Sequence, residues 1–255
     1  MRFLRVIVIF VILLSISCGK SGGIRNLDDL NGKTLGIKKG TVVGDLALEV
    51  IPTAKLKFFP DLDEMLIDLQ RGGIDAMVDD VPPLLNLAAK QPGLMVLDKL
   101  ITEDDYAFAT AMNRPEMKAV VDKVINDLRR DGTYTAMMNR WFPEVGEPGR
   151  MPEIRLEATN GVLKFGTAAV TEPFSFFDSS GKVVGFDVEL AHYVARELGM
   201  GIEVRNMPFR SLIPNVIAHK VDIVGGCITI TAARERHVLF SIPNYKGGVG
   251  ALVLK

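Results

Sequence analysis

The chain has 255 residues, and its 30 basic residues nearly balance its 31 acidic ones, which gives a formal net charge of −1 at pH 7. Because no basic excess is available to neutralise phosphates, this balance argues against nucleic acid as a partner. The two cysteines, Cys18 and Cys227, predict no disulfide framework, so the core must come from packing. A chain of this length supports that as one large domain or as two lobes.

The first residues have the build of a signal peptide. Arg2 and Arg5 precede an apolar run at residues 6–16 that is too short to span a bilayer. Residues 15–19 resemble a bacterial lipoprotein processing site with Cys18 as the lipidated residue, although Ser15 stands where Leu is usual. A plain secretory signal and an uncleaved anchor stay open as alternatives. We expect an exported protein of the periplasm or cell envelope, held at the membrane by a lipid anchor.

The first half of the chain alternates predicted strands and helices. A strand at 34–37 runs into a Lys-Lys-Gly-Thr turn and then a helix that ends at Val50. Asp61 opens another helix at capping-box spacing, and the apolar segment 74–78 after it predicts a short buried strand. A longer helix starts near Pro115, because apolar residues recur there at helical spacing.

Residues 143–161 are rich in proline and glycine, and this composition predicts a linker. After it the alternation resumes, with a strand at 162–167, a helix at 187–198 and strands at 202–205 and 221–224.

The two halves share a helix–strand unit. Leu66 and Leu69 stand eight and five places before Ile74, and Ile213 and Val216 stand at the same distances before Val221. We therefore predict two similar α/β lobes with parallel strands covered by helices. A single continuous sheet is the alternative.

A Thr-Ala-Ala-Arg turn at residues 231–234 has the chemistry of a carboxylate site. Thr231 can cap a helix, free backbone N–H groups then face outward, and the Arg234 guanidinium supplies a two-pronged donor. The alternative is an ordinary cap beside a surface arginine.

Taken together, these segments resemble a known family, the periplasmic solute-binding proteins of ABC transporters, and within it the polar amino-acid-binding branch (bacterial extracellular solute-binding proteins, family 3). The resemblance covers residues 26–142 and 161–255 and implies a two-lobed α/β fold of the type II periplasmic-binding-protein class. The motifs that carry it are Pro173-Phe174-Ser175-Phe176, Gly185-Phe186-Asp187, Val221-Asp222, Thr229-Ile230-Thr231 with Arg234, Gly40-Thr41, Asp79-Asp80, and Asp131-Gly132-Thr133-Tyr134 with Trp141-Phe142.

The order of these motifs is exchanged relative to the family, which predicts a circular permutation. The expected parts are a signal peptide at 1–17, the family's second lobe at 24–105, a crossover with first-lobe C-terminal helices at 106–143, a linker at 144–160, and the remainder of the first lobe with the second crossover strand at 161–255. We expect only residues 105–112 to link the lobes covalently, and hence a looser hinge. A truncated tandem of two receptors gives the same order and stays open.

The resemblance also implies a binding mechanism. Arg234 takes the α-carboxylate of an amino acid, helped by Thr229 and Thr41, and Asp80 takes the ammonium from the opposite lobe when the cleft closes. Phe209 forms an apolar wall, and Lys38 reaches toward a ligand side chain, with an exposed strand-end lysine as the alternative. The remaining expected site residues are Gly40, Cys227 and Thr171.

Three positions depart from the family pattern. Ala168 stands where an Asp is usual, Thr171 where an aromatic residue is usual, and Cys227 where a Gly is usual. These departures argue against a close copy of a glutamine or arginine site and favour a smaller or differently shaped amino acid, or another small carboxylate.

Enzymatic function is not expected, because the three histidines lack metal-ligand spacing and no nucleophile elbow or phosphate loop occurs. No cofactor and no metal are predicted. We expect a monomer that delivers its ligand to an ABC permease. Two alternatives stay open: a sensory lipoprotein, and a dehydratase on the same fold with Glu172 or Asp80 as proton carrier.

Overall fold

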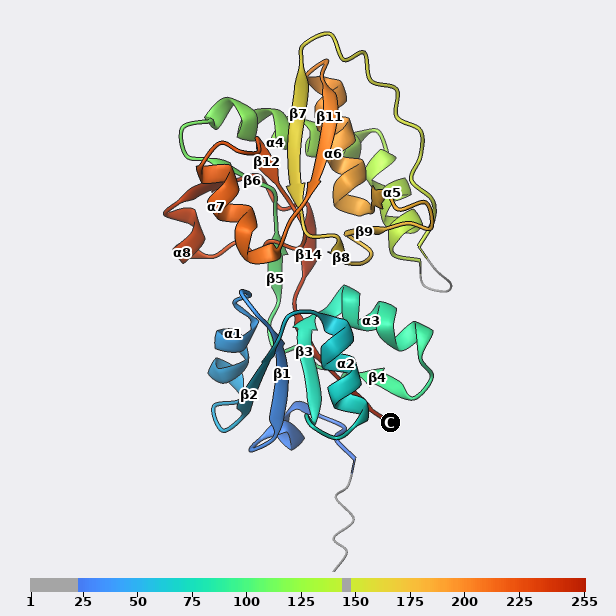
Figure 1. Ribbon diagram of the computed structural model, residues 1–255, viewed down its shortest axis with the longest axis vertical. Coiled ribbons are helices and arrows are strands. Elements are labelled where there is room, and N and C mark those ends of the chain that lie inside the picture. Colours follow the sequence, from blue (N-terminus) through green and yellow to red (C-terminus); the bar gives the residue numbers. More distant parts are fainter. Residues whose placement is uncertain (1–22, 144–147) are drawn as a thin grey trace, which may run out of the picture.

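The computed structural model describes residues 23–143 and 148–255, which form two α/β lobes joined by two strands (Figure 1). The expected two-lobed α/β fold is confirmed, because each lobe has its own mixed five-stranded sheet. The expected signal peptide and Cys18 lie outside the described residues. Within the described ranges, no helix has the length and apolar character needed to cross a membrane.

The lower lobe is a sheet with helices on both faces. Its elements are η1 (Leu27–Leu30), β1 (Thr34–Lys38), α1 (Val43–Val50), β2 (Lys55–Phe59), α2 (Leu62–Gln70), β3 (Ala76–Asp80), α3 (Val81–Lys90), β4 (Leu94–Val96) and β15 (Val249–Leu254). The strand order is β2-β1-β3-β15-β4, with β1 parallel to β2 and β3. The side chain of Asp61 accepts a hydrogen bond from the Glu64 N–H and so starts α2 where the capping-box spacing predicts it.

The alternation of side chains along β3 explains the layering of this lobe. Ala76 and Val78 pack in a cluster with α1, whereas Met77 between them packs in a second cluster with α2 and α3. Successive residues of a strand point to opposite faces, so β3 is buried on both sides. In the sequence, β3 therefore reads as three apolar residues followed by two acids, Asp79 and Asp80.

The upper lobe repeats the same strand arrangement in the order β11-β7-β12-β6-β13. Its strands are β6 (Ala109–Ala111), β7 (Val162–Thr167), β11 (Gly201–Asn206), β12 (Ile223–Val224) and β13 (Val238–Phe240), with a small separate sheet of β8 (Val170–Thr171), β9 (Ser175–Phe177) and β10 (Val183–Val184). Its helical segments are α4 (Pro115–Arg130), α5 (Thr133–Trp141), α6 (Phe186–Glu197), η2 (Phe209–Ser211), α7 (Leu212–Ile217) and α8 (Ala232–Glu235). Residues 148–161 contain no helix or strand.

Two antiparallel strands connect the lobes, and they correct one prediction. β5 (Asp104–Tyr106) runs upward beside β14 (Tyr245–Gly247), and the chain then continues downward into β15. β15 pairs with β3 and β4, so it completes the lower sheet. The expectation that only residues 105–112 link the lobes covalently is therefore wrong, because the crossing through β14 is also continuous. The lower lobe takes one strand from the far end of the sequence, since residues 249–253 are apolar and almost fully buried there.

This arrangement predicts that a single side chain of β15 carries much of the stability of the lower lobe. Leu252 is fully buried between β3 and the second cluster, whereas Leu254 on the same strand is 45% exposed. Leu252→Ala should lower the free energy of unfolding by about 2–5 kcal/mol. Leu254→Ala, the matched control, should change it by less than about 0.5 kcal/mol. Chemical denaturation measures both, and equal small effects would contradict the placement of β15.

Candidate functional site

The lower lobe contributes a buried charged cluster at the carboxyl ends of β1 and β3. Lys38 is 4% exposed, and its Nζ hydrogen-bonds to Oδ1 of Asp79 at 3.3 Å and pairs by charge with Oδ2 at 3.0 Å. The alternative of an exposed strand-end lysine is therefore wrong. Burial opposes the charged form of Lys38, but Asp79 and Asp80 outweigh it and raise the pKa of this lysine. Its ammonium is already satisfied by Asp79.

Asp80 is the member of this cluster that contacts the crossover strand β5. The Tyr106 hydroxyl donates to Asp80 Oδ1 at 2.6 Å, and the Asp80 N–H donates to Asp79 Oδ1 at 2.8 Å. Burial, and then the charge of Asp79, raise the pKa of Asp80 to about 7, against the opposing influence of Lys38 and Tyr106. Asp80 thus lies near its titration point at neutral pH.

The upper lobe contributes the predicted Thr/Arg turn. Thr231 caps α8, since its hydroxyl accepts the Arg234 N–H at 3.3 Å, and this part of the prediction is confirmed. The Arg234 guanidinium turns back, donates to the Thr229 carbonyl at 2.8 Å and lies over the Phe209 ring at 5.8 Å. It is half-buried, and burial lowers the pKa of its guanidinium, while the charge of Asp80 opposes this shift.

The loop before Thr229 is shaped by a buried acid. Asp187, at the start of α6, accepts the Asn244 side-chain N–H at 2.7 Å and the backbone N–H groups of Gly226 and Cys227. Burial raises the pKa of Asp187 to about 7, and these hydrogen bonds oppose the shift. Cys227 has a φ of +54°, which few L residues adopt, and its thiol is 3% exposed. Burial raises the pKa of this thiol well above its ordinary value.

The structure brings some expected site residues together and leaves others apart. Gly40, Phe209 and Arg234 line one cavity of about 130 Å³. The Thr41 hydroxyl donates to the Lys38 carbonyl at 2.9 Å, and α1 begins at Val43 without a side-chain cap. Thr171 is 1% exposed, and its hydroxyl has no hydrogen-bond partner within the described ranges. Thr41 and Thr171 therefore face local backbone and core rather than Arg234.

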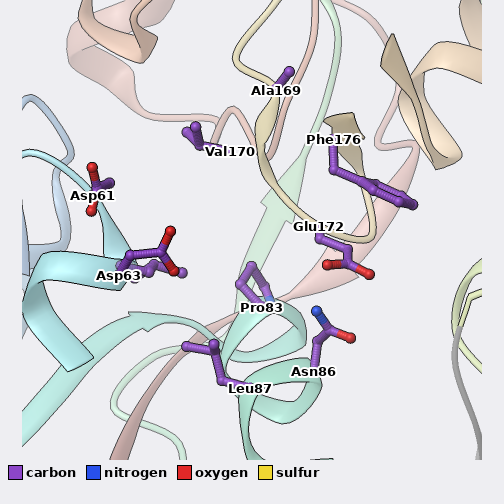
Figure 2. Close-up of a pocket in the computed structure, with 10 residues that line it drawn as sticks. Asp61, Asp63, Pro83, Asn86, Leu87, Ala169, Val170, Glu172 and Phe176 are labelled. Carbon is purple, nitrogen blue, oxygen red and sulfur yellow. The ribbon is translucent and has the colours of Figure 1, made fainter. Parts of the chain in front are cut away.

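A larger cavity of about 250 Å³ lies between the lobes (Figure 2). Apolar side chains and three acids line it, drawn from α2 and α3 below and from the β7–β9 region above: Asp61, Leu62, Asp63, Pro83, Asn86, Leu87, Ala169, Val170, Glu172 and Phe176. Lys90 of the lower lobe pairs with Glu172 of the upper lobe at 2.8 Å.

Sequence reasoning missed Asp79, Tyr106, Asp187 and Asn244 as parts of this region. The doublet of acids after a buried strand is a signal for Asp79, because one of two adjacent buried acids needs a counter-charge. Tyr106 and Asn244 carry no such signal, since their partners lie far away in the sequence. Within the described ranges, no group of His, Cys, Asp and Glu side chains is placed to hold a metal ion.

Comparison with known proteins gives partial matches. Residues 163–255 match the family of bacterial extracellular solute-binding proteins, family 3, which confirms the expected resemblance for this segment. The chain is 40% identical over 89 residues to the probable ABC transporter arginine-binding protein ArtJ of Chlamydia trachomatis, which covers 35% of this chain and 34% of that protein. It is 30% identical over 122 residues to ABC transporter arginine-binding protein 1 of Escherichia coli, which covers 46% of this chain and 50% of that protein.

Among solved structures, the arginine-bound form of domain 1 from TmArgBP is 37% identical and covers 37% of this chain and 80% of that one, with a TM-score of 0.33. Cyclohexadienyl dehydratase of Pseudomonas aeruginosa, an enzyme by name, is 32% identical over 95 residues, which covers 37% of this chain and 35% of that protein. The chain thus spans about a third to a half of the curated relatives described above. It is similar to amino-acid-binding proteins of ABC transporters.

The buried ion pair predicts a pH-dependent loss of stability on substitution. Lys38→Met leaves the Asp79 and Asp80 carboxylates without their counter-charge, and removing one partner of a buried pair costs about 3–5 kcal/mol. The loss in unfolding free energy should be smaller at pH 5 than at pH 8, because burial raises the pKa of Asp80 to about 7 and this acid is then protonated and needs no counter-charge. Urea denaturation at the two pH values measures it, with the exposed Lys39→Met as the matched control. A loss that is equal at both pH values would contradict the pairing.

Proposed function

We propose that this protein is an extracytoplasmic solute-binding lipoprotein that captures an amino acid between its lobes and delivers it to an ABC permease. The observation that carries the proposal is a pair of opposite charges from different lobes that influence each other: Arg234 in α8 of the upper lobe and Asp80 at the end of β3 of the lower lobe. The carboxylate of an amino acid would replace the Thr229 carbonyl as a partner of Arg234, and its ammonium would pair with Asp80. Only a closed cleft makes both contacts, so the ligand would shift the population toward closure.

The lining of the larger cavity favours a ligand with a cationic side chain. Asp61 and Asp63 at the start of α2 line it from the lower lobe, and Phe176 and Leu87 provide apolar surface (Figure 2). Glu172 also lines it and is paired with Lys90. Three residues depart from the family pattern in a way that speaks against an arginine-like site, and all are at most 3% exposed: Ala168, Thr171 and Cys227. These three residues are buried in the core, whereas acidic residues line the larger cavity. The relatives named for arginine make L-arginine the first probe.

A thermal-shift screen with a matched pair of arginine variants tests this function. At a hundredfold excess over Kd, a ligand adds about 2.7 kcal/mol of stability to the protein. We expect L-arginine, or another amino acid of the panel, to do so for the wild type and for Arg236→Ala, whose side chain is exposed. Arg234→Ala should lose the effect. A folded wild-type protein that no amino acid or small carboxylate stabilises would overturn the proposal.

We also infer that the order of segments is a circular permutation. Both crossover strands are present, and Ile24 packs against the cluster that contains Val249 and Val253 of β15. A link from residue 255 back to residue 24 would therefore be short. A variant joined there and opened within residues 148–161 should fold with the same melting temperature and ligand response. Failure of this variant to fold, or a reading frame that continues into a second lower lobe, would favour the tandem.

The lipid anchor at Cys18 is part of the proposal and rests on the processing-site pattern. Fractionation of a Cys18→Ala variant tests it: this variant should leave the membrane fraction, and wild-type protein found free in the soluble fraction would exclude the anchor.

A dehydratase is the second candidate function. Asp80, with a pKa of about 7 and a place at the cleft, has the properties of a proton carrier, and one relative is named as a dehydratase. Incubation with prephenate-like acids separates the two functions. Turnover that Asp80→Asn abolishes would establish the enzyme, and stabilisation without turnover would establish the receptor.

A further inference from the structure

Tyr106 lies where the two lobes and the two crossover strands meet. It is the last residue of β5 and is 1% exposed. Its backbone pairs with Tyr245 of β14 and forms an isolated bridge with Thr229, and its carbonyl accepts the Asn244 N–H at 2.9 Å. One residue thus contacts both the second crossover strand and Thr229, an expected ligand residue.

The hydroxyl of Tyr106 reaches the opposite lobe. It donates to Asp80 Oδ1 at 2.6 Å and accepts the Gly248 N–H at 3.1 Å. Gly248 directly follows β14, so a single hydroxyl links the lower-lobe acid to the second crossover. Hydrogen bonds to a charged acceptor are among the stronger ones in proteins.

The ring of Tyr106 is held independently of this hydroxyl. It stacks on Tyr245 with ring centroids 6.0 Å apart and an interplanar angle of 8°, and it meets Phe174 edge-on. A Cβ atom on Gly247 would come within 2.5 Å of the ring, so the hinge backbone packs directly against it. A phenylalanine at position 106 would keep these contacts and lose only the hydroxyl.

We propose that Tyr106 is a positioning residue for ligand binding, whose hydroxyl orients Asp80 and ties it to the hinge. This inference rests on the proposed function in one respect, namely that Asp80 receives the ligand's ammonium. When the cleft closes, Asp80 and the two crossover strands would then move together.

The groups around Asp80 determine in which direction its pKa should move when the Tyr106 hydroxyl is removed. The groups that influence it are Asp79 and Lys38 of the lower lobe, Tyr106 and Asp104 of β5, and Arg234 and Cys227 of the upper lobe. Among them Tyr106 lowers the pKa of Asp80, because a donor to the carboxylate favours its charged form. Loss of the hydroxyl should move the titration of Asp80 to higher pH, and an ammonium ligand needs the ionised acid.

The first measurement needs no ligand. Because burial raises the pKa of Asp80 from 3.8 to about 7, its protonation stabilises the folded state fully below pH 3.8, and this contribution is lost as the pH rises through about 7. In Tyr106→Phe the loss should extend to higher pH, which melting temperatures between pH 4 and pH 9 detect. Tyr245→Phe is the matched control: it removes the hydroxyl of the stacked ring but leaves the bond to Asp80. Identical pH profiles for Tyr106→Phe and the wild type would overturn the inference.

The second measurement is the binding of L-arginine by calorimetry over the same pH range. Tyr106→Phe should bind about tenfold more weakly at pH 7, and the midpoint of the acid limb of its profile should lie at higher pH. Tyr245→Phe should match the wild type. Weaker binding with an unshifted midpoint would indicate general damage and would overturn the inference. A shifted stability profile in a protein that binds no amino acid would support the link to Asp80 while refuting the proposed function.

Discussion

The cleft depends on the burial of two adjacent acids at the end of one strand. Asp79 and Asp80 follow the apolar part of β3 directly, so the chain cannot bury this strand without taking both carboxylates out of water. Such a transfer is tolerated only if counter-charges and donors meet the acids. Lys38 at the end of the neighbouring strand supplies the first, and Tyr106 from the hinge supplies the second. Because Tyr106 belongs to the connection between the lobes, the acids of the lower lobe are fixed to the upper lobe through it.

The upper lobe also contains a buried acid, Asp187, which is stabilised by hydrogen-bond donors. Asp187 is buried at the start of α6, where it accepts backbone N–H groups from the Gly226–Cys227 loop. A carboxylate at a helix start is favourable, and here it also holds open a loop with an unusual backbone conformation. Thr229 and Arg234 follow this loop, so their placement relies on a residue that never faces the cleft. Both halves of the candidate site therefore rest on charges that are hidden from solvent.

Local signals in the sequence predict the elements well. The cap at Asp61 and the Thr231 turn are both found where short-range patterns place them, because their partners lie within a few residues. Features that depend on contacts between residues far apart in the sequence are harder to predict from short-range patterns. The expected docking of the C-terminal strand on the other lobe is found, but the prediction of a single covalent link was wrong, because the chain also crosses between the lobes through β14 before β15 pairs with β3. Lys38 illustrates a third case, since a lysine at a strand end is usually exposed and only Asp79 makes its burial favourable.

The position of β15 in the lower sheet has a consequence for how the protein acquires its structure. Strands β3 and β4 do not touch each other along the sheet; β15 lies between them, and Val249 pairs with Asp80. When the chain is released from its N-terminus, most of the lower lobe comes first, yet its sheet lacks the strand between β3 and β4 until β15 follows. In the upper lobe, by contrast, β6, α4 and α5 come before the linker, and all other elements lie in one continuous stretch from β7 to β13. Such long-range closure is entropically slow, so the early half must wait with an open sheet edge, and the acids at the cleft become enclosed only in the final step.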